Sequence, residues 1–521
     1  MSYYIDFFRT EPTGPLTSLR EYTVASQLAD SRSGSPQPEQ CTEEGYDDPV
    51  SLGLIPEDNV IRLFYSFHTM LNPVLALLDP ALHTPHYVRR RSKVLYTAIL
   101  AASCKFFNPG LYKRVHDLAQ RLIGRALADG ICTIEYIQAL SIISYWREPD
   151  DGSCWRKIGL AIRMAYELNL HLVSEDMMPL DELAARERLN QERTWFRCLG
   201  YDWNSALQRG KPRMISENHF PKDARQWLNG HAGIESDADL LLVVSIELAP
   251  HYNLYQSLRS ATTDRNRNHL APFIRHTIRE GERLNEMWAP EKVDPTISHI
   301  SRSFIQFYNL RMRLITSELK LLVTTPIPGA SHLALLDCAN AALAIVKHVT
   351  EEFAPHGYLS YGQDFIPFST AYAGAWLFKQ HPRMDDQLRT ATLDTFRRLS
   401  ETCRAQTRFD RDTTSYYSRF FDHLVNFLTP TQNGAGGVGN GQMFSGPTGI
   451  GARGGLGGTG FVPGGNIQTN MNAMLPSSLP PLEDMDATWV LAANGFDNLG
   501  LEGTMNLGLT MGSVPFSARL N

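Results

Sequence analysis

The sequence predicts an all-α protein: a large multi-helical domain between a disordered N-terminal segment and a glycine-rich, disordered C-terminal tail. Apolar residues recur at three- and four-residue spacing through most of residues 48–429, which is the pattern of amphipathic and buried helices. The alternation typical of strands is scarce and isolated. The chain is 43% hydrophobic and 10% aromatic, enough for a substantial core. No repeat of 34 to 47 residues can be registered, so a regular solenoid is not expected.

Residues 1–47 are predicted to be a disordered linker. Their second half reads SRSGSPQPEQCTEEGYDD, which is polar and rich in turn residues. The first residues, MSYYIDFFRTEPTG, lack the basic and apolar regions of a secretory signal. The seven cysteines of the chain are dispersed without a C-x2-C pair, which fits reduced thiols inside the cell.

Ten helices are predicted in the central region. Those of its first half cover residues 57–71, 92–107, 112–130, 133–146 and 154–170, and those of its second half cover 240–258, 301–323, 331–353, 367–379 and 415–428. Pro56, Pro73, Pro109 and Gly130 fall near the breaks, as helix start and stop signals do. No stretch approaches the roughly 20 apolar residues that span a bilayer, so no membrane partner is expected.

The motifs of the common enzyme classes do not assemble, and we expect no enzymatic activity. The chain has no G-x-S-x-G, no H-E-x-x-H and no P-loop. One G-x-G-x-x-G occurs at Gly449, Gly451 and Gly454, but it lies in the glycine-rich tail without the strand and helix that a dinucleotide site needs.

A histidine pair and the densest basic run of the chain follow one another in LHTPHYVRRRSK. His83 and His86 flank Pro85 and have no third ligand nearby, so a loop or helix-entry role is expected rather than a metal site. The basic run could be a nuclear-import signal or a phosphate contact, but a solvated turn before a helix that starts near Ser92 is the preferred interpretation. The run consists of Arg89, Arg90, Arg91 and Lys93.

The stretch CWRKIGLAIRMAYELNLHL, residues 154–172, could be a helix that contacts nucleic acid or a helix of the core. On a helical wheel its apolar residues cover more than half of the circumference, and its charged residues share one narrow sector. We therefore expect a buried helix, with Arg163 and Glu167 paired along the sector. Because a helix that docks on DNA needs a wide polar face, the core interpretation is preferred.

The order of motifs around this stretch resembles the fungal-specific transcription factor domain, or middle homology region, of zinc binuclear cluster regulators. The Ala-Ile-Arg-Met-Ala helix is followed by a charged helix that runs into a Trp, by an Asp and by a Gly-Lys-Pro turn, in RERLNQERTWFRCLGYDWNSALQRGKPRMI (186–215). Residues 48–80 resemble the entry of that domain, and the likeness weakens beyond residue 220. The resemblance implies a structural role for the motif residues Trp155, Ala161, Arg163, Ala165, Trp195, Asp202, Gly210 and Pro212.

The resemblance implies a nuclear, helical regulatory domain without enzymatic activity, covering residues 48–429. In this family DNA is bound by a separate cluster of six cysteines that holds two zinc ions, and no such cluster occurs in this chain. Either the chain is a truncated product, in which case zinc and DNA binding belong to an upstream module, or it acts without a DNA contact of its own. The implied partners are coactivators or other regulators, and the resemblance leaves room for a homodimer and a small-molecule effector.

The C-terminal tail divides into a glycine-rich linker, residues 430–474, and an acidic-hydrophobic segment, residues 475–521. Acidic side chains keep neighbouring apolar side chains solvated and available to a coactivator groove, so this segment is expected to activate transcription. The residues expected to do so are Leu482, Asp484, Asp486, Trp489, Leu491, Phe496 and Leu499.

The sequence thus predicts a fungal nuclear regulator of transcription by RNA polymerase II. The alternative is a helical co-regulator that binds other regulators and never contacts DNA itself.

Overall fold

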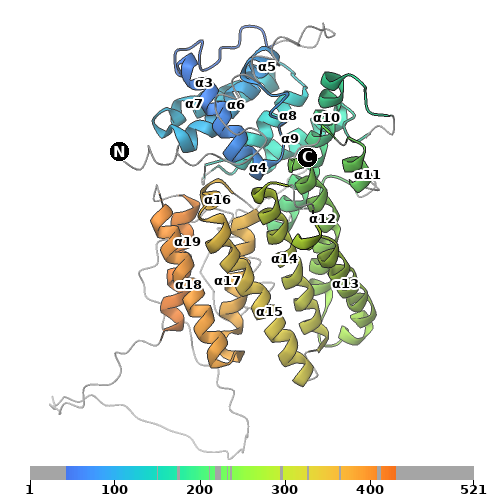
Figure 1. Ribbon diagram of the computed structural model, residues 1–521. Coiled ribbons are helices and arrows are strands. Elements are labelled where there is room, and N and C mark those ends of the chain that lie inside the picture. Colours follow the sequence, from blue (N-terminus) through green and yellow to red (C-terminus); the bar gives the residue numbers. More distant parts are fainter. Residues whose placement is uncertain are drawn as a thin grey trace, which may run out of the picture.

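The computed structural model describes residues 43–148, 151–172, 177–209, 212–216, 224–231, 233–234, 237–293, 297–324, 328–362, 365–407 and 412–429. Every regular element in these ranges is a helix, which confirms the all-α class (Figure 1). The expected disorder of the N-terminal segment up to residue 42, the glycine-rich linker, the activation segment and the G-x-G-x-x-G all lie outside the described residues. Packing begins upstream of residue 48, since Tyr46 is buried.

The first group of helices, here called the N-lobe, packs around two central helices, α6 and α8. Eleven of the 12 residues of α8, from Glu135 to Tyr145, are buried, so this helix is enclosed on all sides. Its N-cap is Thr133, whose hydroxyl accepts a hydrogen bond from the Tyr136 N–H at 3.2 Å. The amphipathic helices α7 and α9 cover α6 and α8. The N-lobe comprises α3 (Glu57–Ser66), the π-helix η1 (Phe67–Leu71), α4 (Asn72–Leu75), α5 (Pro85–Arg91), α6 (Lys93–Phe107), α7 (Pro109–Ala128), α8 (Ile134–Tyr145), α9 (Cys154–Glu167) and α10 (Glu182–Arg209).

The second group, the C-lobe, is an array of long helices below the N-lobe in Figure 1. Helix α14 lies at its centre and packs on α12, α13 and α15, while α18 and α19 form a pair at the far side. The C-lobe comprises α11 (Ala224–Asn229), α12 (Asp237–Ala261), α13 (Arg267–Met287), η3 (Pro290–Lys292), α14 (His299–Thr324), α15 (Pro328–His348), the π-helix η4 (Val349–Phe353), α16 (Tyr358–Tyr361), α17 (Phe365–Gln380), η5 (His381–Arg383), α18 (Asp386–Gln406) and α19 (Thr413–Leu428).

The structure contains long helices that the apolar periodicity did not predict, α13 and α18. Both are predominantly polar, and their buried stripes are narrow. In α18 the stripe includes Thr392, Thr395 and Ser400 as well as apolar residues, so the hydrophobic pattern underestimates its buried face.

One segment, Gly329–Phe353, is long and apolar enough to cross a membrane, which corrects the expectation that no stretch reaches that length. Its side chains at Cys338, Ala342, Ile345 and Val349 are fully buried. It packs against α14, α17 and α18, so it is a core helix of the C-lobe.

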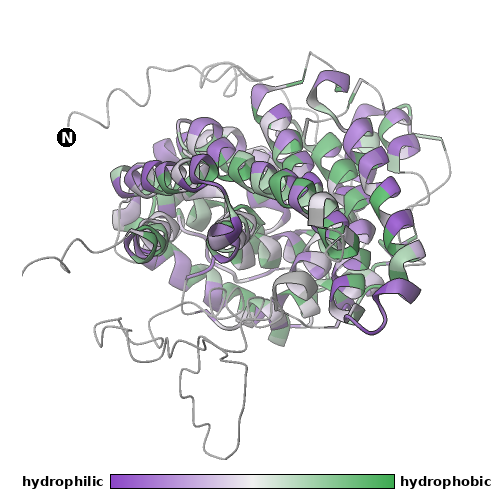
Figure 2. Cartoon of the chain, turned by 90° about the horizontal axis from the view of Figure 1, so that it is seen from below, coloured by the Kyte–Doolittle hydropathy of each residue, from purple (hydrophilic) through white to green (hydrophobic). Residues whose placement is uncertain are grey.

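The two lobes share one continuous hydrophobic core. Where the two lobes meet, the indole N–H of Trp146 donates to the carbonyl of Tyr361 in α16 at 2.9 Å. Trp146 is the residue at which α8 ends. The Phe106 ring of α6 lies edge-on to the Tyr361 ring, with 5.2 Å between centroids. Seen from below, most helices carry both hydrophobic and hydrophilic residues, as helices that each contribute one face to a common core do (Figure 2).

Candidate functional site

The motif residues of α9 and α10 meet where these two helices pack on each other. Ala161 and Ala165 are buried on the inner side of α9, and Trp195 is completely buried in α10. The Trp195 ring contacts the Tyr166 ring of α9, with centroids 5.3 Å apart and nearly perpendicular planes. Trp155 is half-buried at the start of α9. The small alanines thus allow α9 to approach its neighbours closely.

Helix α9 is amphipathic rather than buried on nearly all sides, so the expected narrow polar sector is wrong. Seven of its 14 residues are buried, while Arg156, Arg163 and Glu167 are exposed. Arg163 donates to the carbonyl of Gly159 at 3.2 Å, and the expected pair with Glu167 does not form. The helix also ends earlier than predicted, because Asn169 takes a left-handed conformation with φ of 56°.

The motif aspartate, Asp202, joins α10 to the segment that follows it. Its buried carboxylate accepts hydrogen bonds from the backbone N–H groups of Met214, at 3.0 Å, and Ile215, at 2.9 Å. Burial raises the pKa of Asp202, although these hydrogen bonds oppose the shift. The sulfur of Met214 lies 3.4 Å from the point where a Cβ atom would stand at Gly159, so the segment also packs on α9. Gly210 lies outside the described residues, and Pro212 is exposed.

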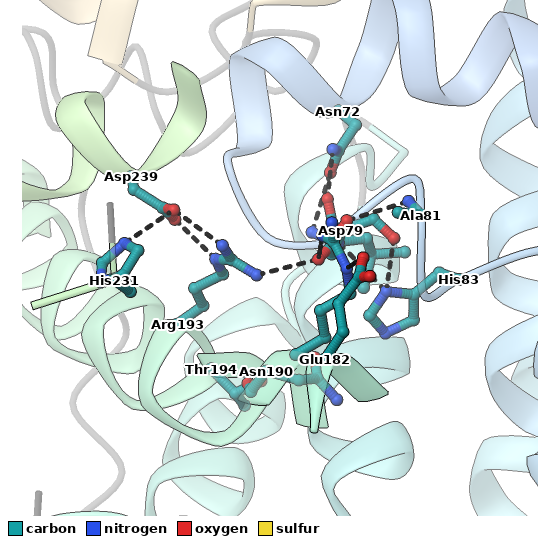
Figure 3. Close-up of polar contacts among 12 residues, drawn as sticks. Asn72, Asp79, Ala81, His83, Glu182, Asn190, Arg193, Thr194, His231 and Asp239 are labelled. Carbon is teal, nitrogen blue, oxygen red and sulfur yellow. Dashed lines mark hydrogen bonds and ion pairs between the residues drawn. The ribbon is translucent and has the colours of Figure 1, made fainter. Parts of the chain in front are cut away.

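A buried network of charged side chains links α10 with the C-lobe. Arg193 of α10 donates from Nε and Nη2 to the two carboxylate oxygens of Asp239 in α12, at 2.6 and 2.7 Å (Figure 3). The His231 Nε2 lies 3.2 Å from the same carboxylate. The side chains of Arg193 and Asp239 are 2% and 0% exposed, so this bidentate ion pair is buried away from water.

The same arginine reaches the loop between α4 and α5 through Asp79. The Nη1 of Arg193 lies 3.4 Å from the Asp79 carboxylate. Arg186, two helical turns earlier in α10, donates to the same carboxylate at 2.8 Å. Burial raises the pKa of Asp79, but Arg193 and Arg186 outweigh it and hold the pKa below its ordinary value. Asn72 fixes the loop by two hydrogen bonds with the backbone of Leu78, at 2.7 and 3.0 Å (Figure 3). Arg193 therefore links its own helix, α10, with α12 and with the loop between α4 and α5.

The sequence analysis did not identify Arg193 as a site residue, although its position in α10 indicated that it is buried. Arg193 lies four residues after Leu189 and three before Phe196, both of which are completely buried. That spacing places the arginine on the apolar stripe of α10. A charged residue on such a stripe needs a buried partner, but the sequence does not say which residue it is.

The basic run is a helix and not the expected solvated turn. Three of its cations have partners within the N-lobe. Arg89 pairs with Asp48 at 2.9 Å, Arg91 pairs with Glu135 at 2.8 Å, and the Lys93 ammonium donates to the carbonyl of Tyr46. Arg90 is exposed. Arg89 and Lys93 thus hold the chain N-terminal to α3 against α5 and α6, and Arg91 links α5 to α8.

The two histidines before the run differ in environment. His83 is 1% exposed and its Nδ1 lies 3.0 Å from the Asp79 carbonyl, whereas His86 is exposed. The backbone carbonyl of His83 lies 3.1 Å from Nε2 of buried His68. Burial lowers the pKa of both His68 and His83 to about 4, so both rings are neutral near pH 7.

The six described cysteines do not fit a zinc cluster. In the described ranges no three His, Cys, Asp or Glu side chains come together as a metal site requires. Burial raises the pKa of Cys104, Cys198 and Cys403 to about 12, which keeps these groups as thiols, whereas zinc binds thiolates. The cysteines contribute to the core as small apolar side chains.

Comparison with known proteins finds a match for the region that contains the motif residues of α9 and α10. Residues 82–222, from the end of the α4–α5 loop to beyond α10, match the family described as the fungal specific transcription factor domain. The chain is also 29% identical over 360 residues to Protein priB of Lentinula edodes, a match that covers 68% of this chain and 60% of that protein. No solved structure matches. The match over residues 82–222 confirms, for this region, the family resemblance that the motif order predicted.

Proposed function

We propose that this protein is a nuclear regulator of transcription by RNA polymerase II in a fungus. The match of residues 82–222 to the fungal specific transcription factor domain carries the proposal. In it, residues 48–429 form the regulatory domain, and residues 475–521 form an activation segment that a coactivator binds. Within the buried network Arg193, Asp79 and Asp239 satisfy one another, which fits a structural role of these side chains in such a domain.

DNA contact is assigned to a zinc module outside this sequence. The chain spans 60% of the length of the relative that it matches. The test is to read the genomic sequence upstream of Met1 for an in-frame six-cysteine cluster and to measure DNA binding of the present chain in a gel shift at low salt. A specific shift by the chain alone would contradict this assignment.

The activation segment is tested by its transfer to another protein. Residues 475–521, fused to an unrelated DNA-binding domain, should induce a reporter gene. Replacing Trp489, Leu491 and Phe496 together by alanine should abolish induction, because these side chains are the ones that a coactivator groove would bury. As the matched control, an equal fusion of the glycine-rich linker 430–474 should be silent. A silent 475–521 fusion would contradict the activation role.

A co-regulator without its own DNA contact is the alternative outcome. It would follow from the absence of an upstream cysteine cluster together with recovery of the chain on promoter DNA only in the presence of another regulator. Nuclear localisation is tested separately with a fluorescent fusion. An Arg90→Ala variant addresses the basic run, since Arg90 is exposed and its loss leaves the ion pairs of Arg89 and Arg91 intact.

A further inference from the structure

Helix α13 lies at an outer edge of the C-lobe (Figure 1). It packs on α12 and α14, and its buried residues include Ile274, Ile278 and Leu284. The rest of its first half is exposed and carries Arg275 and Arg279, which are one helical turn apart. We call this exposed set the α13 face, and it consists of Arg265, His269, Pro272, Phe273, Arg275, His276 and Arg279.

The α13 face is basic, and neighbouring carboxylates do not neutralise it. No acidic residue occurs between Asp264 and Glu280 in the sequence. The acids that flank this stretch are paired with other cations, in the pairs Asp264–Arg267, Glu280–Arg283 and Glu282–Lys320. Among the described residues, no carboxylate forms an ion pair with Arg265, Arg275 or Arg279. The face therefore carries uncompensated positive charge, which attracts acidic groups.

This charge is a local property of α13. On α18, a second surface helix of the C-lobe, exposed arginines have acidic partners, in the pairs Arg397–Asp394, Arg398–Glu351 and Arg404–Asp422. The whole chain has a net charge of −6. The α13 face is thus a restricted basic surface on an acidic protein.

The α13 face also offers apolar contact area. Phe273 is 65% exposed. Its neighbour in the sequence, Pro272, lines a shallow surface hollow of about 360 Å³ together with Ile278, Arg275 and Arg279. The hollow thus combines two aliphatic side chains with two guanidinium groups. Aromatic side chains and arginine are the residues that are enriched in protein interfaces.

This combination fits an acidic peptide better than a nucleic acid. Single-stranded nucleic acid is bound by several aromatic rings along a basic groove, whereas Phe273 is the one Phe, Tyr or Trp of the α13 face. The aliphatic side chains of Pro272 and Ile278 have no counterpart in a phosphate backbone, but they match the leucines of an amphipathic helix. From His269 to Arg279 the face extends for about 15 Å along the helix axis, enough for two to three turns of a bound helix.

We propose that the α13 face binds an acidic amphipathic helix of a partner protein. The carboxylates of that helix bind Arg275 and Arg279, and its apolar side chains pack on Phe273 and in the hollow. The proposal names a docking surface and a partner class for the regulatory role proposed above, and it rests on that role. Peptide binding by the purified chain is measured without transcription, so it can fail while the reporter and localisation tests succeed.

The test measures binding of a fluorescent probe peptide to the full chain by anisotropy. The probe has about 18 residues, or five helical turns, with Leu at three- and four-residue spacing and Glu at most other positions. We expect saturable binding that weakens as the salt concentration rises. Arg275→Glu combined with Arg279→Glu should weaken binding about tenfold or more, because like charges then face each other. Phe273→Ser should weaken it severalfold. Circular dichroism should show wild-type helicity for these variants, since the replaced side chains are exposed.

The matched control is Arg397→Glu combined with Arg398→Glu. It makes the same change of charge at exposed arginines of α18 and should leave the affinity for the probe unchanged. Two further peptides separate the contributions of charge and apolar contact. One has every Glu of the probe replaced by Gln, the other has every Leu replaced by Ala, and each should bind the wild-type chain severalfold more weakly than the probe.

The proposal is overturned if the α13 double variant binds the probe like the wild type, or if the Gln peptide binds as tightly as the probe. It is also overturned if the Ala peptide or single-stranded DNA binds as tightly, because the face would then select any polyanion. The acidic segment 475–521 of the chain itself is tested with Glu483→Gln, Asp484→Asn and Asp486→Asn combined in the full chain. This variant should bind the probe like the wild type, and a severalfold gain in affinity would show that the chain's own segment occupies the face, which overturns the assignment to a partner.

Discussion

Arg193 and Asp239 form a bidentate ion pair in the interior, with N–O distances of 2.6 and 2.7 Å. The pair connects α10 of the N-lobe with α12 of the C-lobe. Their side chains are 2% and 0% exposed. The same guanidinium reaches Asp79 in the loop between α4 and α5. The relative position of the lobes therefore depends on one arginine as well as on the shared apolar core.

The first prediction concerns this pair. Arg193→Met should lower the free energy of unfolding by about 3–5 kcal/mol, because it leaves the buried carboxylate of Asp239 without its arginine and leaves Asp79 with Arg186 alone. Adding Asp239→Asn should recover part of the loss, since the charge that was left unpaired is then removed. Urea denaturation followed by circular dichroism measures both effects. Arg397→Met is the control, because Arg397 pairs with Asp394 at the surface and should change stability by less than about 0.5 kcal/mol. Equal effects of Arg193→Met and Arg397→Met would contradict the prediction.

The second prediction concerns pH and the buried histidines. The pKa of His68 and that of His83 are about 4 in the folded chain, against an ordinary 6.5. The unfolded chain therefore binds more protons between these values, and stability should fall as the pH falls from 6.5 to 4, by up to about 3 kcal/mol for each ring. His68→Gln should flatten the dependence of Tm on pH in this window. His86→Gln, at an exposed site, should leave it unchanged, and a wild-type Tm independent of pH from 6.5 to 4.5 would refute the prediction.

The third prediction concerns the inner face of α9. Ala161→Asp or Ala165→Asp should prevent folding, because each places a carboxylate without a partner at a position that is at most 1% exposed. Arg156→Ala should change stability by no more than about 0.5 kcal/mol, since Arg156 is exposed. Soluble yield and thermal melts distinguish the two classes. A folded Ala161→Asp variant with wild-type Tm would show that α9 is not packed as described.

The fourth prediction concerns the carboxylate that holds the segment after α10. Asp202→Ala should lower the free energy of unfolding by about 2–4 kcal/mol, because the Met214 and Ile215 N–H groups lose their acceptor. Limited proteolysis should become faster at residues 212–216, and mass spectrometry of the fragments measures this. Asp394→Ala, at a surface ion pair, is the control and should not change the cleavage. Unchanged proteolysis of Asp202→Ala would contradict the anchoring role.

Local patterns predicted much of the fold. Helices α6 and α8 were predicted nearly to their ends, because their largely apolar composition and flanking caps are properties of adjacent residues. Helices α13 and α18 were not predicted, since a helix that buries threonine and serine beside a few apolar residues has a weak hydrophobic pattern. The width of the exposed face of α9 was misjudged for a related reason. Its half-buried Trp155, Leu160 and Tyr166 count as apolar on a wheel, yet they lie at the edge of the packed face.

The candidate site was predicted only in part. The motif order located Trp195 and Asp202 but gave them no contacts, and it passed over Arg193. The environment of this arginine is set by residues far away in the sequence, since Asp239 is 46 residues from Arg193 and Asp79 is 114 residues from it. No local periodicity contains that information.

The sequence by itself determined the helical class, the order of most helices and the resemblance of residues 82–222 to a regulator family, because helical periodicity, caps and motif order are read within a few turns of the chain. Only the tertiary structure decided which charges are paired. It joined Arg193 to two carboxylates. The physical reason is that the free energy of a buried charge depends on the groups that folding brings around it, and those groups come from distant segments.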